Sequence, residues 1–357
     1  MSNMLLYIVV FALFGFLAMY FIYRPVINKY TQTLEIKLSS LAFPYIWVLY
    51  AACAVVAYFT VDLRSFVESL TLYRMLIPLI AAAVIYASTL LFSQKIICAV
   101  VAAALAITIW SQPLGVGNTF PLDPLWLRLI VLFFAFIFCM GSRITNILPH
   151  TFVLPNIVIL CGLILLALIN SSPLYIAVCA AVLIGLLAAY LSLNYYTVTI
   201  DLDEGACVAI SYLVCSLLLM NLGEFCFPSC MIFTLIFWAE MLVALYNRFL
   251  ITHIGALREN TNYFFAAQRY SLQTLTSAIL KVGIVLLFIG WFQLFSINSY
   301  SLIIIALLIV IWLDSSFGRR SDTPSTFADI NRKFVADVKQ NLQEVKKLFN
   351  PERKDKK

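Results

Sequence analysis

The sequence predicts an all-α, polytopic membrane protein with about 11 transmembrane helices. Apolar residues make up 63% of the 357-residue chain and charged residues only 11%, which is outside the usual composition of a soluble globular domain. The charged residues lie between apolar runs of roughly 15 to 23 residues, long enough to cross a hydrocarbon core of ~30 Å. Runs such as 157–169 are continuously apolar and lack the alternation of a barrel strand, so they predict helices.

The predicted spans follow these apolar runs along the chain. The first run is full length and is followed by Arg24, so we expect a membrane anchor and not a cleavable signal. In chain order, the predicted spans cover residues 4–23, 41–60, 75–92, 96–110, 127–141, 151–169, 173–193, 207–222, 225–247, 278–297 and 300–314.

Lys and Arg predict the orientation, because cytoplasmic loops hold the excess of these residues. An outside N-terminus gives the outer segments only Arg64, Arg74 and Arg128. An odd number of spans then places the C-terminus in the cytoplasm. The inner segments carry Arg24, Lys29, Lys37, Lys95, Arg143, Arg248, Arg258 and Arg269, followed by a basic tail.

That tail, residues 315–357, holds 11 Lys+Arg against 6 Asp+Glu and accounts for +5 of the chain's net +6. From Phe327 onwards apolar residues recur every three or four positions with Lys and Arg between them, as in a helix lying on an anionic leaflet. The same pattern is typical of a solvated amphipathic helix that packs on a cytoplasmic loop or a partner, and both interpretations stay open. Nucleic-acid binding is not expected, because no aromatic interleaving or fold motif accompanies the charge.

The nine cysteines lie mostly inside the predicted spans, without a CxxC pair or a histidine partner, and are interpreted as small apolar core residues. Cys226 and Cys230 flank Phe227-Pro228-Ser229 at the predicted outer end of a helix. Their position is compatible with a disulfide in an oxidising compartment.

Polar residues near the spans are the candidates for chemistry, since each is costly to hold in a bilayer. The inner segment 194–206 gathers Asp201, Asp203 and Glu204 where the span near Cys207 begins. Clustered carboxylates beside a helix start suit a hard cation such as Mg²⁺, which prefers a few carboxylates plus phosphate oxygens. The competing interpretation is that Asp203 caps the helix and the other carboxylates are solvated.

Two further inner segments hold candidate binding residues. Arg143, Thr145, Asn146 and His150 come from Ser-Arg-Ile-Thr-Asn-Ile-Leu-Pro-His, in which a lone histidine beside a proline is more often structural than catalytic. The segment 248–277 mixes basic and aromatic residues, which suits a nucleotide diphosphate or serves only as the positive-inside signal. Its arginines are Arg248, Arg258 and Arg269, and its other candidates are His253, Glu259, Tyr263 and Tyr270.

Glu240 is the strongest candidate for a paired intramembrane carboxylate. It lies about two turns from the inner end of its span and eight residues before Arg248. We therefore predict a structural pair between these two side chains.

In the order of these segments the chain resembles the polyprenyl-phosphate N-acetylhexosamine-1-phosphate transferases, the glycosyltransferase 4 group that includes the phospho-N-acetylmuramoyl-pentapeptide transferases. The family has ten or eleven spans, an outside N-terminus and a site of cytoplasmic loops. Its motifs follow the third, fifth, seventh and ninth spans. At the corresponding positions the chain has Ser93-Gln94-Lys95, Asn146, Asn194 with Asp203-Glu204-Gly205-Ala206, and the segment 248–273. The family also has an acidic residue eight positions before an Arg, which Glu240 resembles.

The resemblance covers roughly residues 75–290, and the chain departs from the family where the chemistry is expected. The family's Asp pair aligns near Ala87 and Ser88, Pro149 stands where an Asp is expected, and its His-rich stretch reads Gln268-Arg269-Tyr270-Ser271. Losing one charge-stabilising element commonly costs ~10²–10³ in rate. We therefore expect a divergent member that is impaired in catalysis.

The resemblance implies transfer of a sugar-1-phosphate from a UDP-sugar to undecaprenyl phosphate, in cell-wall or surface-polysaccharide synthesis at the bacterial inner membrane. In this hypothesis Asp203 and Glu204 bind Mg²⁺ and act in catalysis. Substrate-binding roles fall to Arg143, Asn146, His150, Asn194, Arg258 and Arg269.

Two other hypotheses stay open. The first is a non-catalytic relative that binds a polyprenyl lipid or a partner glycosyltransferase. The second is a prepilin-peptidase-like membrane aspartyl protease, which Leu148-Pro149 followed by Leu154-Pro155-Asn156 resembles over about 70 residues, although its paired Asp is absent at Ser142 or Arg143.

Overall fold

The computed structural model describes residues 2–31, 39–61, 69–111, 124–169, 174–194, 202–220, 227–252, 257–295 and 302–310, and every regular element in these ranges is helical. The elements are α1 (Ser2–Thr31), α2 (Ser39–Val61), α3 (Ser69–Leu91), α4 (Gln94–Ser111), α5 (Pro124–Thr145), α6 (Pro149–Ile169), α7 (Leu174–Leu193), α8 (Glu204–Met220), α9 (Phe227–Tyr246), η3 (Asn247–Thr252), η4 (Leu257–Asn260), α10 (Asn262–Arg269) and α11 (Leu272–Phe295). Residues 302–310 form a further helical segment.

The all-α class is thus confirmed for the described part of the chain. Within it, seven helices are long and apolar enough to cross a membrane, and three more are apolar but shorter. The seven are Met4–Pro25, Gln94–Ser111, Leu125–Thr145, Pro149–Ile169, Tyr175–Leu193, Pro228–Phe249 and Gln273–Gln293. The protein is therefore a multi-pass helical membrane protein.

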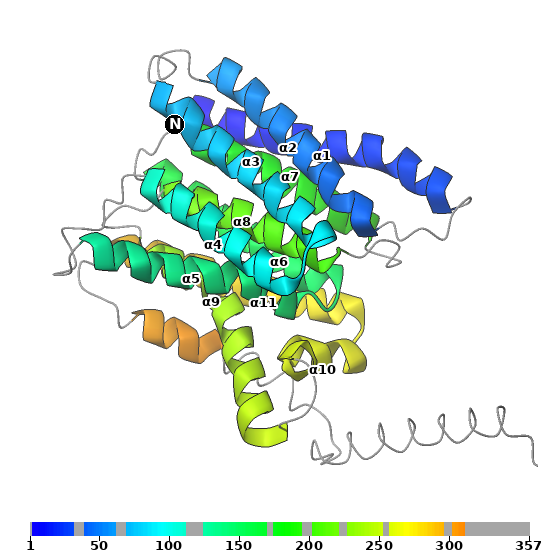
Figure 1. Ribbon diagram of the computed structural model, residues 1–357, viewed down its shortest axis with the longest axis vertical. Coiled ribbons are helices and arrows are strands. Elements are labelled where there is room, and N and C mark those ends of the chain that lie inside the picture. The colour runs from blue at the N-terminus through cyan, green and yellow to red at the C-terminus, as the bar shows by residue number, and fades with distance from the viewer. Residues whose placement is uncertain are drawn as a thin grey trace, which may run out of the picture. The chain divides into compact units, whose positions relative to one another are not determined.

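Helices α6, α7 and α8 form the centre of the first compact unit, Met1–Ser315. Most of their described side chains are buried, and apolar residues lie on every side of each helix, as expected for a helix surrounded by others. Helix α7 packs against α1, α2 and α6, while α8 packs against α3 and α5 (Figure 1).

The outer helices turn large apolar side chains away from this centre. Leu6 and Phe21 of α1 are 62% and 68% exposed, and Phe133 of α5 is 60% exposed. Large apolar surface of this extent is unfavourable in water but not in lipid tails. The exposed face is therefore the lipid-facing surface.

The contact between α1 and α7 is close enough to require glycine. A Cβ built on Gly185 would lie 2.1 Å from the backbone oxygen of Ala12, and one on Gly15 would lie 2.8 Å from that of Val182. Small residues of this kind let helix backbones approach within a membrane, where packing rather than the hydrophobic effect drives association.

Helix α9 crosses the neighbouring helices steeply (Figure 1). The predicted span ended at residue 247, but the helix continues as a π-helical turn, η3, to Thr252. The predicted inner segment 248–277 also contains η4 and α10, and α11 begins at Leu272 rather than 278. The second compact unit, Ser316–Lys357, lies outside the described residues, so the amphipathic tail stays a prediction.

Candidate functional site: a polar cluster and an apolar cavity

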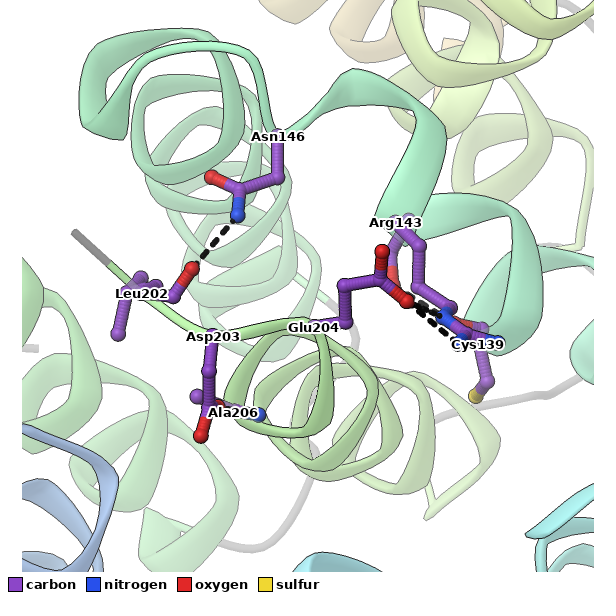
Figure 2. Close-up of polar contacts among 8 residues, drawn as sticks. Cys139, Arg143, Asn146, Leu202, Asp203, Glu204 and Ala206 are labelled. Carbon is purple, nitrogen blue, oxygen red and sulfur yellow. Dashed lines mark hydrogen bonds and ion pairs between the residues drawn. The ribbon is translucent and has the colours of Figure 1, made fainter. Parts of the chain in front are cut away.

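The polar cluster forms where α3 and α5 end and α8 begins. The Tyr86 hydroxyl on α3 donates to Asp203 Oδ2 at 3.4 Å, and a Cβ on Gly205 would collide with Thr89 of α3. On the other side, Arg143 of α5 reaches Glu204 (Figure 2). The C-terminal ends of α3 and α5 and the start of α8 therefore meet at one end of the helices, which we call the polar end.

Asp203 caps α8. Its Oδ1 accepts a hydrogen bond from the backbone N–H of Ala206 at 2.6 Å, which satisfies one of the free donors of the first turn. The predicted cap is thereby confirmed, whereas Glu204 is paired with Arg143 and Asp201 lies outside the described residues. With Oδ2 facing Tyr86, the carboxylate is turned away from Arg143 (Figure 2).

Glu204, the first residue of α8, forms an ion pair with Arg143. Arg143 Nε and Nη2 both donate to the same oxygen, Oε2, at 3.0 and 2.5 Å. The Arg143 side chain is 18% exposed and that of Glu204 is 59% exposed. The two predicted site residues are thus brought together across 61 positions of sequence.

Asn146 holds the α5–α6 turn against the start of α8. Its side-chain N–H donates to the backbone oxygen of Leu202 at 2.8 Å, and only 3% of the residue is exposed (Figure 2). Thr151 closes the turn by donating to the Thr145 backbone oxygen and accepting from the N–H of Ile147. The geometry of Asn146 is that of a residue that positions backbone, and its substrate-binding role stays a prediction.

The remaining predicted site residues lie as follows. His150 is fully buried in the first turn of α6, and buried Asn194 donates to the Tyr190 backbone oxygen one turn earlier in α7. Arg258 and Arg269 belong to η4 and α10, which the structure describes, but their side chains lie outside the described part. Cys226, His253 and Asp201 also lie outside it.

Glu240 is fully buried in α9, and its Oε2 accepts from the backbone N–H of Tyr263 at 3.4 Å. Tyr263 lies in the first turn of α10, where Thr261 forms the N-cap. The predicted partner Arg248 lies in η3 and is half-buried. This hydrogen bond ties α10 to α9, and the pair between Glu240 and Arg248 stays a prediction.

The described residues do not by themselves fit Mg²⁺. Among them, no group of three or more His, Cys, Asp or Glu side chains is placed to hold a metal ion. Asp203 is engaged by a backbone N–H and Glu204 by an arginine. Mg²⁺ prefers near-octahedral coordination by several oxygens, and its binding here stays a prediction.

An apolar cavity of about 190 Å³ lies between α5, α8 and α9. Its walls are almost entirely apolar. They include Phe134 and Phe138 of α5, Leu218 of α8 and Trp238 of α9. A cavity with such walls is suited to a hydrocarbon chain.

Sequence reasoning missed Tyr86, Thr89 and this cavity. Tyr86 directly precedes Ala87 and Ser88, the positions aligned with the family's Asp pair. A tyrosine hydroxyl next to these positions was the signal that could have indicated it. The cavity had no such signal, because its walls have the same composition as the rest of the spans.

No protein-family model matches the chain, and no curated protein matches it. The resemblance to the sugar-1-phosphate transferases therefore rests on the order and spacing of segments alone.

Proposed function

We propose that this protein binds a polyprenyl-phosphate-type lipid in a membrane, and that it is a divergent relative of the sugar-1-phosphate transferases impaired in transfer. The apolar cavity between α5, α8 and α9 carries the proposal. A chain of isoprene units is pure hydrocarbon, and it gains dispersion contacts in a cavity whose walls are apolar on all three helices.

Impaired transfer is supported by the partners of the two acidic residues. Asp203 stabilises the first turn of α8, and Glu204 neutralises Arg143. Phosphosugar transfer brings polyanions together and relies on positioned carboxylates and metal to stabilise charge. Carboxylates that already serve as a cap and an ion-pair partner supply little of that stabilisation.

The proposed topology has eleven spans with the N-terminus outside, in a bacterial inner membrane. The polar end is then cytoplasmic, and this agrees with the position of Arg143 at the end of α5. A partner glycosyltransferase is the protein partner proposed with it.

Lipid binding is tested by native mass spectrometry of the full chain with undecaprenyl phosphate. Ala135 is a small cavity-lining residue of α5, so Ala135→Leu fills space and is expected to weaken binding at least tenfold. The matched control is Ala103→Leu on the exposed face of α4, which is expected to bind as the wild type does. Equal binding by Ala135→Leu and the wild type would contradict the proposal.

The second candidate is an active transferase with a reorganised site. The meeting of Arg143, Asp203 and Glu204 at the polar end favours it. Purified protein is assayed for UMP release from UDP-N-acetylhexosamine with undecaprenyl phosphate and Mg²⁺. Turnover that Asp203→Asn abolishes would establish this candidate, while no turnover under conditions where an active relative works would remove it.

A further inference from the structure

The ion pair at the polar end has an incomplete geometry. Both Arg143 donors converge on one Glu204 oxygen, so the pair is not the parallel two-oxygen fork that arginine forms with its best partners. Glu204 is largely exposed. Exposed ion pairs contribute little to stability, so this carboxylate is held weakly.

A phosphomonoester is a stronger ligand for the same guanidinium. It carries up to two negative charges on three acceptor oxygens, and it matches the arginine fork with two parallel hydrogen bonds. The site lies at the N-terminal end of α8, whose dipole favours an anion. The one other acidic side chain described in the cluster, Asp203, is directed to Ala206 and Tyr86.

Arg143 is also close to the cavity along the chain. Phe138, the last cavity-lining residue of α5, precedes Arg143 by five residues, or roughly 8 Å of helix. Both the ion pair and the cavity are built on α5 and α8, and on α5 the arginine lies just beyond the end of the cavity that is nearer the polar end.

We infer that Arg143 binds the phosphomonoester headgroup of the lipid and that Glu204 is an intramolecular carboxylate that occupies Arg143 until the headgroup displaces it. The inference rests on the proposed function and adds the headgroup site to it. It also reverses the predicted role of Glu204: the residue opposes ligand binding instead of assisting it through a metal.

The test measures binding of undecaprenyl phosphate, undecaprenol and inorganic phosphate to the full chain in nanodiscs. Glu204→Gln keeps the shape of the side chain and removes its charge, so undecaprenyl phosphate is expected to bind about two- to fivefold more tightly. Arg143→Gln is expected to weaken that binding at least tenfold, and the double variant should behave as Arg143→Gln does. Arg128→Gln, at a half-buried arginine near the opposite end of α5 from Arg143, is the control and should leave binding unchanged.

The three probes separate the possible failures. Undecaprenol affinity should be the same in all variants, because this lipid has no phosphate. Unchanged or weaker binding of undecaprenyl phosphate by Glu204→Gln would overturn the inference, as would inorganic phosphate displacing the lipid at equal concentration. If the wild type binds neither lipid, the proposed function itself fails. Should Glu204→Gln not fold, Glu204→Asp, whose shorter side chain weakens the pair, is expected to change affinity in the same direction.

Discussion

The same glycine-to-alanine change should have different consequences at two buried positions, Gly185 in the contact between α1 and α7 and Gly141 in α5. At Gly185, the added Cβ would lie 2.1 Å from the backbone oxygen of Ala12, more than 1 Å short of the 3.4 Å at which ordinary contact begins. At Gly141 of α5, the nearest atoms are the sulfur of Met241 at 3.0 Å and two ring carbons of Phe237 at 3.3 Å. The neighbour of Gly185 is helix backbone, whereas the neighbours of Gly141 are side chains that can shift by a few tenths of an ångström.

The expected magnitudes follow from two opposing effects. Replacing glycine in a helix by alanine gains up to ~1 kcal/mol of helix propensity. Overpacking a well-packed interior costs typically ~1–3 kcal/mol. Gly185→Ala must move α1 as a body, so we expect it to lower the free energy of unfolding by about 1–2 kcal/mol, whereas Gly141→Ala should be neutral or slightly stabilising.

Thermal unfolding in detergent micelles measures the difference, with Gly141→Ala as the matched control. A midpoint for Gly185→Ala a few degrees below that of Gly141→Ala is expected. Adding Ala12→Gly to Gly185→Ala should not restore stability, because the collision is with the backbone oxygen and not with the Ala12 side chain. A Gly185→Ala protein as stable as Gly141→Ala, or a rescue by Ala12→Gly, would refute the reasoning.

Three further predictions concern buried polar contacts. Thr108 and Tyr212 share a 2.7 Å hydrogen bond between α4 and α8, so a double-mutant cycle with Thr108→Val and Tyr212→Phe should give a coupling of about 0.5–2 kcal/mol; additive effects would argue against this bond. Asp203→Ala should cost about 0.5–2 kcal/mol in thermal unfolding and Asp203→Asn less, since asparagine still caps α8, and equal losses would contradict the cap. Glu240→Leu should speed hydrogen exchange at the start of α10 while Glu240→Gln largely preserves protection, and unchanged exchange in Glu240→Leu would show that this carboxylate does not hold α10.

The helical class was predictable because a bilayer forces every spanning backbone to satisfy its own hydrogen bonds. Long apolar runs therefore located the helices, but not all their ends. Helix α11 begins at Leu272 and includes Gln273 and Thr274, polar residues that an apolar run excludes although a helix accommodates them at its end. The π-helical extension of α9 likewise left no mark in the hydropathy pattern.

The candidate site was predictable as a group of positions and not as a set of contacts. Topology brought Arg143, Asn146, Asp203 and Glu204 to one end, as the order of spans indicated. Their partners were hidden: Asn146 bonds to a backbone oxygen, which has no signature in the side-chain sequence, and one carboxylate of an adjacent pair faces α3 while the other faces α5. The two carboxylates find different partners because their side chains point in different directions at the start of α8. Residue type alone does not determine that direction.

The glycine-mediated contact between α1 and α7 also has a consequence for how the protein is made. Helix α1 leaves the ribosome before α7, and at ~5–20 residues per second the roughly 140 residues between them take on the order of ten seconds or more to synthesise. During that delay the face of α1 around Gly15 lacks the α7 backbone that packs against it in the finished protein. Of the contacts described for α1, only those with α2 can form before then.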